Sequence, residues 1–339
     1  MTFELDPGNA LGYLRESGVV PGDADGESRA LGGGVSNRVV MTETDAGCFV
    51  LKQPLENLAV EDDWPADVER IHNEASAARA YADVLEGVER ARVPEVRFES
   101  HEDHVAAFSC APADAVVWKR ELLDGTVDAG VARLVGRLLG TVHASVEDDA
   151  ELRSAFESRA PFRQLRVDPY HRTVARRHPD VAGEIEREID RMAAVSRTLV
   201  HGDYSPKNVL LAPDGDDREA WILDFEVAHW GDPAFDTAFM CNHLFVKSVY
   251  NAERRAAYHE AVEAFWEGYA ERGFDVERET VRELGVLMLA RIDGKSPVEY
   301  VTDGETADTL RTIAKRTLRE GIDTLSAFRE LVVEESDHP

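Results

Sequence analysis

The chain has 339 residues, of which 43% are hydrophobic, and a formal net charge of -28. This length and composition predict a folded protein with one or two hydrophobic cores and exclude an intrinsically disordered chain. The excess of acidic residues argues strongly against a nucleic-acid partner, because the phosphate backbone would be repelled. The sequence has no run of eighteen apolar residues, and it does not begin with the basic and apolar regions of a signal peptide. We therefore expect a soluble cytoplasmic protein, a monomer or homodimer, with no membrane partner.

Lysine and cysteine are both scarce. Only six of the 38 basic residues are lysines, and an acidic, lysine-poor surface suits a high-salt cytoplasm, where counterions screen the self-repulsion. A halophilic source is our hypothesis from this composition. The three cysteines, Cys48, Cys110 and Cys241, lie far apart and form no CxxC pair, so we expect neither a disulfide framework nor a zinc site. We also find no cluster of histidine and cysteine at metal-ligand spacing.

The first part of the chain is rich in predicted strands. Residues 37–42 and 48–53 are β-rich runs joined by the turn-forming segment TDAG, which predicts a hairpin preceded by the glycine-rich stretch GGGVSN. A Trp-Pro pair, early acidic residues and many alanines predict a helix over about residues 66–84. The segments VPEVRFES, HVAAFSC and AVVWKREL predict three further strands. We therefore expect residues 1–121 to form a small sheet with one main helix.

The remainder, residues 122–339, has mostly helical patterns. One apolar stripe at helical spacing predicts a helix in the segment VDAGVARLVGRLLGTVHAS, and residues 181–195 predict another. Two short apolar runs, VLL and AWILDF, predict a hairpin inside this helical region. Beyond residue 233 the chain is helical again by its pattern. The sequence therefore predicts an α+β fold with a β-rich N-lobe and a helical C-lobe.

Two features of the N-lobe match the requirements of phosphoryl transfer, in which backbone and cationic groups hold the nucleotide phosphates. Lys52 lies on the strand after the glycine-rich stretch and Glu74 on the following helix, where a helix glutamate holds a strand lysine beside the phosphates. Glycines let backbone N–H groups approach phosphates closely, although a tri-glycine turn is more often only a turn. We predict nucleotide contacts from Gly33, Gly34, Ser36 and Asn37.

The segment HGDYSPKNVLL, residues 201–211, supplies the other groups that phosphoryl transfer needs. Asp203 would accept or orient the proton of the substrate hydroxyl, and Asn208 would offer a neutral oxygen to Mg²⁺. Asp224 follows at the end of a short apolar strand, in a suitable position for a second Mg²⁺ ligand. We expect His201 to shape the loop by hydrogen bonding. Lys207 is expected to approach the transferred phosphate, with an exposed loop lysine as the alternative.

Together, these motifs resemble those of the aminoglycoside phosphotransferase and choline kinase family. The resemblance covers about residues 28–245 and includes GGGVSNRVV, LLGTVHAS, HGDYSPKNVLL and ILDFEVAHWGDPAFDTAF. It implies a bilobal protein-kinase-like fold, ATP and Mg²⁺ as cofactors and a small-molecule acceptor. It also implies Asp203 as the catalytic base, Asn208 and Asp224 as Mg²⁺ ligands, and Lys52 with Glu74 at the phosphates. DFE stands where protein kinases have DFG, and no activation loop is evident, so we expect no protein substrate.

The acceptor is less sharply indicated. The segment KQPLENLAVEDDWPADVERIHNEASAA resembles the corresponding part of 5-methylthioribose kinases, which implies a pentose-like sugar, whereas SPKN is closer to the general phosphotransferase pattern. A kinase for a related sugar or nucleoside-derived compound is therefore an equal alternative. The residues that we name for substrate contacts are Asp232, Arg291 and Lys295. The competing interpretations are helix capping by Asp232 and Asp236 and a solvated turn at residues 290–300.

Two other functions compete with a kinase for a methylthioribose-like sugar. Aminoglycoside- or choline-type phosphotransfer involves a cationic acceptor, but the acidity of this chain does not discriminate because it is general. A non-enzymatic alternative is a pseudokinase that binds nucleotide as a regulatory module. The intact set of Lys52, Glu74, Asp203, Asn208 and Asp224 argues against a pseudokinase, since a degraded site would have lost at least one of them.

Overall fold

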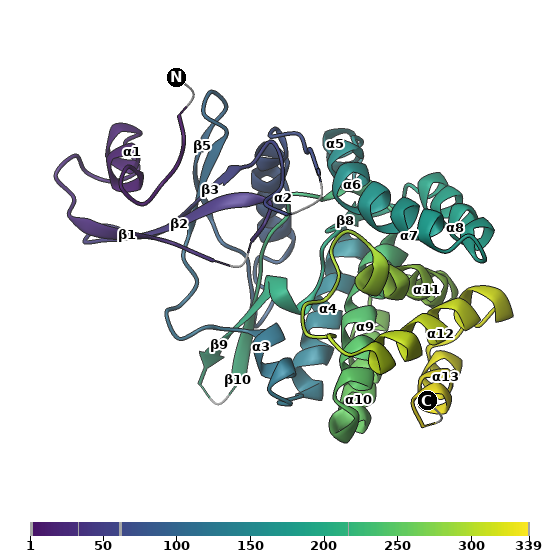
Figure 1. Ribbon diagram of the computed structural model, residues 1–339. Coiled ribbons are helices and arrows are strands. Elements are labelled where there is room, and N and C mark those ends of the chain that lie inside the picture. Colours follow the sequence, from purple (N-terminus) through teal and green to yellow (C-terminus); the bar gives the residue numbers. More distant parts are fainter. Residues whose placement is uncertain (1–2, 33, 61–62, 216, 338–339) are drawn as a thin grey trace. The chain divides into compact units, whose positions relative to one another are not determined.

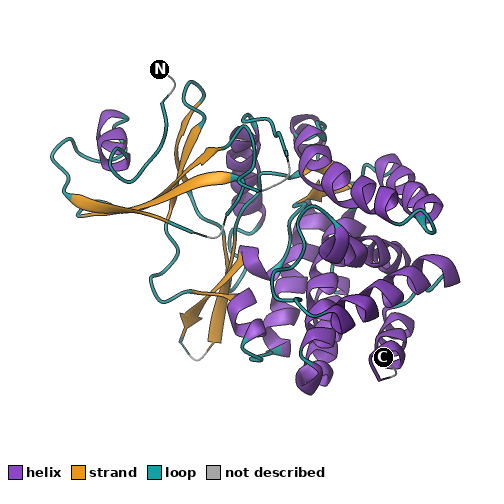
Figure 2. Ribbon diagram, in the orientation of Figure 1, coloured by secondary structure: helices purple, strands orange, loops and turns teal. Residues whose placement is uncertain are grey.

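The computed structural model describes residues 3–32, 34–60, 63–215 and 217–337. The chain forms two compact units: unit one comprises Met1–Ala115 and Ala212–Val227, and unit two comprises Val116–Leu211 and Ala228–Pro339 (Figure 1). Most strands belong to unit one, whereas unit two is mostly helical (Figure 2). This confirms the predicted α+β class. The units differ from the expected division into 1–121 and 122–339 because strand β10 (Asp217–Ile222) pairs in parallel with β4 (Ala91–Arg92) of unit one.

Unit one is built on a five-stranded antiparallel sheet with the order β1-β2-β3-β6-β5. Its strands are β1 (Gly26–Ala30), β2 (Asn37–Thr44), β3 (Gly47–Pro54), β5 (Val96–Ser100) and β6 (Val105–Ser109). The predicted hairpin is therefore confirmed as β2–β3. One hydrophobic core joins helix α1 (Ala10–Glu16) to the sheet through Leu14, Leu51 and Val105. Helix α2 (Arg70–Val84), which begins slightly later than predicted, packs against β3, β5 and β6.

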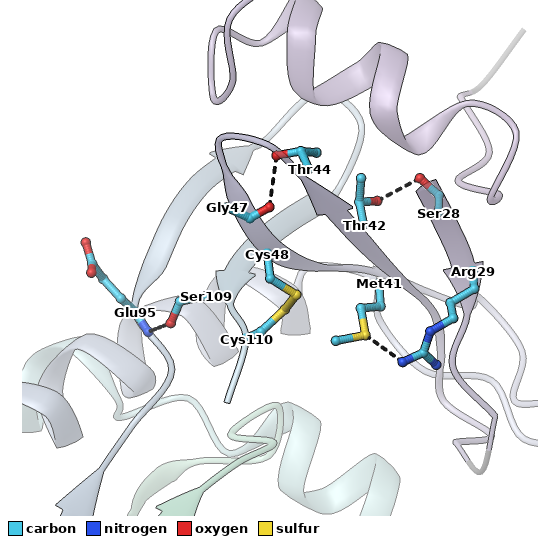
Figure 3. Close-up of a disulfide and its surroundings, with 10 residues drawn as sticks. All are labelled: Ser28, Arg29, Met41, Thr42, Thr44, Gly47, Cys48, Glu95, Ser109 and Cys110. Atoms are coloured by element: carbon cyan, nitrogen blue, oxygen red, sulfur yellow. Dashed lines mark hydrogen bonds between the residues drawn. A yellow bond between two sulfur atoms is a disulfide. The ribbon is translucent and has the colours of Figure 1, made fainter. Parts of the chain in front are cut away.

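Two expectations from the sequence are wrong. In the segment AVVWKREL only β7 (Val116–Val117) is a strand, because helix α3 (Trp118–Leu123) begins directly after it and buries Trp118. Cys48 and Cys110 form a disulfide although 62 residues separate them (Figure 3). The pairing of β3 with β6 places Phe49 opposite Ser109, so the two cysteines come next to each other at the end of that pair. Their spacing along the chain gave no sign of this contact.

Unit two is a helical assembly with a few short strands, of which β8 and β11 are buried. Its helices are α3 (Trp118–Leu123), α4 (Ala129–Ser145), α5 (Ala150–Ala155), α6 (Ala160–Phe162), α7 (Thr173–Arg177), α8 (Ala182–Ala194), α9 (Pro233–Tyr250), α10 (Arg255–Ala270), α11 (Glu277–Asp293), α12 (Gly304–Glu320) and α13 (Leu325–Asp337), with the π-helix η1 (Arg163–Arg172) and the short 3₁₀ turns η2 (Pro206–Asn208) and η3 (Ala252–Arg254). Strand β8 (Thr198–Val200) pairs with β11 (His229–Gly231), and the start of β9 (Val209–Asp214) pairs with β7. None of the described helices is both long enough and apolar enough to cross a membrane.

Helix α4 packs closely on α10 and also contacts strand β8, which precedes the segment HGDYSPKNVLL. Gly136 and Gly140 of α4 lie against the backbone carbonyls of Phe265 and Tyr269, where a Cβ atom would clash. The two helices therefore approach more closely than side chains would allow. Helix α9 is buried along nearly its whole length and packs against β8, α10 and α11. Strand β8 is consequently packed against two buried helices, α4 and α9.

Candidate functional site

In unit one, a lysine of the central strand β3 joins two carboxylates. The Nζ atom of Lys52 donates to Oε1 of Glu74 at 2.5 Å and to Oδ1 of Asp224 at 3.1 Å. Although burial opposes the charged ammonium, Asp224 and Glu74 hold the pKa of Lys52 above its usual range. Burial raises the pKa of Glu74, and the nearby carboxylates add to this effect against the attraction of Lys52. Lys52 is therefore a positively charged side chain held between the carboxylates of Glu74 and Asp224.

Negative charge exceeds positive charge around Lys52. Three carboxylates, those of Glu74, Asp224 and Glu226, act on this one lysine, and Oε2 of Glu74 is buried without a hydrogen-bond partner. Asp224 has a φ of 71°, in the left-handed region that aspartate adopts more readily than most residues. Such special backbone conformations concentrate at functional sites. The donor set, carboxylate oxygens with an excess of negative charge, suits a divalent cation of the Mg²⁺ type.

Glu226, which stands where protein kinases have the glycine of DFG, is a buried structural group. Its Oε2 atom accepts hydrogen bonds from Nε of Arg70 at 3.1 Å and from Nδ2 of Asn37 at 3.0 Å. Arg70 also donates to the backbone carbonyl oxygens of Ser36 and Leu55. The ion pair of Arg70 and Glu226 therefore connects the start of α2 to the end of the glycine-rich stretch and to the DFE segment. Sequence reasoning missed the role of Arg70, since an arginine at a helix start carries no specific signal.

In unit two, three donors surround the carboxylate of Asp203, which is 2% exposed. Arg166 of η1 lies 2.9 Å from Oδ1, while Nζ of Lys207 and Nδ2 of Asn208 each lie 2.8 Å from Oδ2. Because a carboxylate only accepts hydrogen bonds, the amide nitrogen of Asn208 must face Asp203. The amide oxygen of Asn208 therefore points away from Asp203 and is the atom that can bind a cation. The segment HGDYSPKN brings together an oriented buried carboxylate, a cation and a neutral amide oxygen.

The backbone before Asp203 is held by a buried aspartate of α9. The backbone N–H groups of His201 and Gly202 donate to the carboxylate of Asp236 at 2.7 and 2.8 Å. The backbone N–H of Asp203 donates to Nδ1 of His201 at 3.2 Å, which agrees with a loop-shaping role for this histidine. His143 of α4 adds a contact of 3.3 Å to Asp236. Together these bonds fix the conformation of the segment that carries Asp203.

The comparisons with known proteins identify the family of the chain. The model of the phosphotransferase enzyme family matches residues 27–279, about three quarters of the sequence. The chain belongs to the phosphotransferase enzyme family. The resemblance stated from the motifs is thereby confirmed, and the protein is a phosphotransferase. No curated protein matches the chain.

Several solved structures share the fold of this phosphotransferase. A spectinomycin phosphotransferase in complex with ADP and spectinomycin is 14% identical, with 99% of each chain covered and a TM-score of 0.54. An amicoumacin kinase in complex with AMP-PNP and Ca²⁺ is 13% identical, covering 95% of this chain and 97% of that one, with a TM-score of 0.58. A choline/ethanolamine kinase family protein from Mesorhizobium loti is 18% identical, covering 96% and 93%, with a TM-score of 0.51.

The glycine-rich stretch of the phosphotransferase carries the four residues named for nucleotide contacts. Gly33 lies outside the described residues. A Cβ atom at Gly34 would meet no heavy atom within 4 Å, so packing does not require a glycine at this position. The backbone oxygen of Ser36 and the side chain of Asn37 are both engaged within unit one. The predicted nucleotide contacts of these residues remain predictions.

The three residues named for substrate contacts have different environments. Asp232 caps α9 by accepting from the N–H of Ala234 at 3.0 Å and pairs with Arg191 at 2.6 Å, so the capping interpretation fits Asp232, whereas Asp236 holds the catalytic segment instead. Arg291, at the end of α11, is 9% exposed, which excludes a fully solvated turn. Lys295 is half-buried, and its backbone N–H donates to the carbonyl oxygen of Pro169.

A group of histidines in unit one was also missed from the sequence. Glu69, His72 and His101 place possible ligand atoms within 4.8 Å of one another. His72 hydrogen bonds to Glu99 at 2.7 Å and stacks on the ring of His101 at 3.8 Å between centroids. Spacing along the chain could not reveal this group, because the β5–β6 turn brings His101 next to α2. These contacts tie the start of α2 to that turn.

Proposed function

We propose that this phosphotransferase moves the γ-phosphate of ATP to a hydroxyl group of a small molecule, with Mg²⁺ as its cofactor. The observation that carries the proposal is the environment of Asp203, whose carboxylate is buried and held by Arg166, Lys207 and Asn208. A carboxylate fixed in this way is suited to accept a proton from a hydroxyl group in a defined direction. ATP is supported as the donor because the similar spectinomycin phosphotransferase and amicoumacin kinase structures contain ADP and AMP-PNP.

In the proposed reaction, the acceptor oxygen attacks the γ-phosphorus as the bond between that phosphorus and the β,γ-bridging oxygen breaks. Asp203 takes the hydroxyl proton, ADP leaves with the bridging oxygen, and the acceptor becomes a phosphate ester. Lys207 supplies positive charge next to Asp203, where the transferred phosphoryl group would pass. Lys52, held by Glu74, supplies positive charge to the nucleotide phosphates. Positioning and charge stabilisation of this kind account for most of the catalysis in phosphoryl transfer.

The residues present fit Mg²⁺, which prefers carboxylate and amide oxygens. We propose the Asp224 carboxylate and the amide oxygen of Asn208 as its protein ligands. When bound, the ion would neutralise charge on the nucleotide phosphates. The negative excess around Lys52 supports this assignment, because the ion would offset part of it. A pseudokinase has no need for an oriented Asp203 and is therefore the weaker alternative.

For the acceptor, a sugar of the methylthioribose type remains our proposal from the segment that contains Lys52 and Glu74. A related sugar or nucleoside-derived compound is equally compatible. The similar solved structures include proteins described with spectinomycin and as a choline/ethanolamine kinase family member. Their identities below 20% give no information on the acceptor of this chain.

A phosphorylation screen tests the proposal. Purified protein is incubated with ATP, Mg²⁺ and panels of sugars, nucleosides, choline-like alcohols and aminoglycosides at high salt, and acceptor-dependent ADP formation is measured. Asp203→Ala should abolish transfer while the Kd for ATP changes little, because the predicted phosphate contacts lie on unit one. Lys315→Met, which removes a surface lysine paired with Asp180, should leave transfer unchanged. ADP formation that no acceptor stimulates would revive the pseudokinase alternative.

A further inference from the structure

Two basic residues of unit two are buried without an ion pair among the described residues. Lys247 of α9 is 0% exposed, and Arg291 at the end of α11 is 9% exposed. Within the part of the chain that the structure describes, neither forms an ion pair. Nζ of Lys247 donates to the carbonyl oxygen of His243 at 3.2 Å and contacts the hydroxyl of Tyr300 at 3.4 Å. Both partners are neutral, and the ammonium has only the Tyr300 ring, at 5.1 Å from its centroid, and the more distant Glu299 to offset its charge.

Arg291 is bound in a similar way. Its Nη1 atom donates to the hydroxyl of Tyr170 at 3.1 Å and to both oxygens of Ser296. Its Nε atom is buried without a hydrogen-bond partner. A guanidinium keeps its charge in any protein environment. The Nε–H group of Arg291 is thus a buried hydrogen-bond donor without an acceptor.

Other buried basic residues of the chain are paired with acids. Arg70 pairs with Glu226, and Arg166 pairs with Asp203. The chain has 66 acidic residues, so carboxylates are not in short supply. An uncompensated buried charge is strongly destabilising, and folding alone gives no reason to keep two of them in one region. Lys247 and Arg291 are therefore the basic residues whose missing partner needs an explanation.

Neighbouring polar atoms on α9 are also unsatisfied. The amide nitrogen and oxygen of Asn242, which is 0% exposed, have no hydrogen-bond partner, and neither does Nε2 of His243. Buried polar atoms in folded proteins are almost always hydrogen bonded. Several unsatisfied groups therefore lie on the helix that carries Lys247, and a polar ligand would supply missing bonds there.

A short series of contacts connects this group to the catalytic segment. Tyr170 receives the hydrogen bond from Arg291, and the guanidinium of Arg166 lies 5.6 Å from the centroid of the Tyr170 ring. Arg166 in turn pairs with Asp203 at 2.9 Å. Tyr170 thus contacts both Arg291 and the arginine that pairs with Asp203, which supports one acceptor site for Arg291 and Asp203.

We propose that Lys247 and Arg291 bind an anionic group of the acceptor, a carboxylate or a phosphate, while a hydroxyl of the same molecule contacts Asp203. The proposal rests on the kinase function proposed above and replaces its neutral sugar acceptor of the methylthioribose type with an anionic one. A carboxylate or phosphate has several acceptor lone pairs, which match the unused donors of Arg291 and Asn242. Cationic acceptors such as aminoglycosides and choline are excluded by the same charges. The acceptor is a hydroxy acid or a phosphorylated polyol rather than an amino alcohol.

A matched acceptor series tests the sign of the charge. Glucose, glucuronate, glucose 6-phosphate and glucosamine share a ring and differ in one substituent. A second series of glycerol, glycerate, glycerol 3-phosphate and serinol covers small acceptors. ADP formation should occur with an anionic member at a kcat/KM at least tenfold above that of its neutral and cationic partners. The carboxylate and phosphate members distinguish the two possible anions. All measurements are made at one ionic strength, because salt screens such interactions.

Variants separate binding from folding. Lys247→Met keeps the length of the side chain and removes the charge, and it should raise the acceptor KM about 10- to 100-fold, the loss expected for one charge-assisted bond. At pH 6.5 without ligand it should also raise Tm, since an unpaired buried charge is removed. Arg291→Lys should retain part of the affinity and Arg291→Met should lose it. Lys315→Met is the matched control and should change neither KM nor Tm appreciably.

Binding is also measured without turnover, from the rise in Tm that each anionic probe causes. Preferred phosphorylation of neutral or cationic acceptors, or an unchanged KM and probe-induced shift in Lys247→Met, would overturn the anion site and leave the kinase function intact. An anion-induced shift that is lost in Lys247→Met, without any Asp203-dependent transfer, would overturn the proposed function and leave the anion site. A lower Tm of Lys247→Met would show that this lysine serves folding.

Discussion

Replacement of Asp236 provides a demanding test of how the catalytic segment is held. Its carboxylate is fully buried and accepts the backbone N–H groups of His201 and Gly202 at 2.7 and 2.8 Å. Asp236→Ala leaves two buried donors without partners, at about 1–3 kcal/mol each, or about 2–6 kcal/mol in total. For a unit of this size about 2–4 °C of Tm is lost per kcal/mol, so Tm should fall by about 5–20 °C. Asp236→Asn keeps one acceptor oxygen and should lose about half as much.

The same change should affect catalysis separately from stability. Asp203 follows directly after the two N–H groups, and a shift of about 1 Å in a reacting group costs on the order of 100-fold in rate. At a temperature well below Tm we expect kcat to fall by this factor while the KM for ATP stays nearly constant. Phe328→Ala, which removes the ring of α13 that packs against Phe245 at 4.7 Å between centroids, is the control for destabilisation without contact to the loop. A stable kcat in Asp236→Ala, or an equal loss of kcat in the control, would refute a positioning role.

Three further predictions follow from other parts of the structure. Lys52→Met should raise the KM for ATP at least tenfold, measured by initial rates, because it removes the positive charge that Glu74 holds in place. An unchanged KM would show that the nucleotide phosphates do not bind beside Lys52. Reduction of the disulfide between Cys48 and Cys110 should destabilise unit one by about 2–4 kcal/mol, as expected for a long closed loop, measured by urea unfolding with and without dithiothreitol, and equal curves would contradict it. Burial, with Lys119 and Arg291, lowers the pKa of Lys247 to about 7 against the weaker effect of Glu299. The unfolded chain therefore keeps this proton between pH 7 and about 10 whereas the folded chain does not, so stability relative to Lys247→Met should rise over that window. A difference in Tm that does not change with pH would contradict it; neutral Tyr300 and His243, whose pKa values burial shifts away from this window, do not interfere.

Local patterns were sufficient for the elements that decide the fold. The β2–β3 hairpin was predictable because two β-rich runs flank a turn, and α4 because its apolar residues recur at helical spacing. The segment AVVWKREL was not predictable in this way. Its two valines suit a strand, but burial of Trp118 in unit two favours a helix from that residue onward. Tertiary packing overrides local propensity in short segments of this kind.

The site was predictable where its residues are close in the sequence. Asp203, Lys207 and Asn208 lie within one loop, and the structure joins them as their spacing indicated. Groups assembled from distant segments were not predictable. The Cys48–Cys110 disulfide and the contact between Asp236 and the backbone of His201 depend on strand register and helix placement. Neither of those is encoded in a short sequence pattern.

The positions of individual charged residues in this chain say more about the acceptor than the net charge does. A net charge of -28 gave no basis for choosing between a cationic and an anionic acceptor, because exposed carboxylates are screened and general. Buried cations are different, since each must be compensated or remain costly. Lys52 and Arg166 are compensated by acids of their own units, whereas Lys247 and Arg291 are not. In our proposal, these two buried cations receive negative charge from the acceptor whose hydroxyl contacts Asp203. The acceptor should therefore be sought among hydroxy acids and phosphorylated polyols before amino sugars.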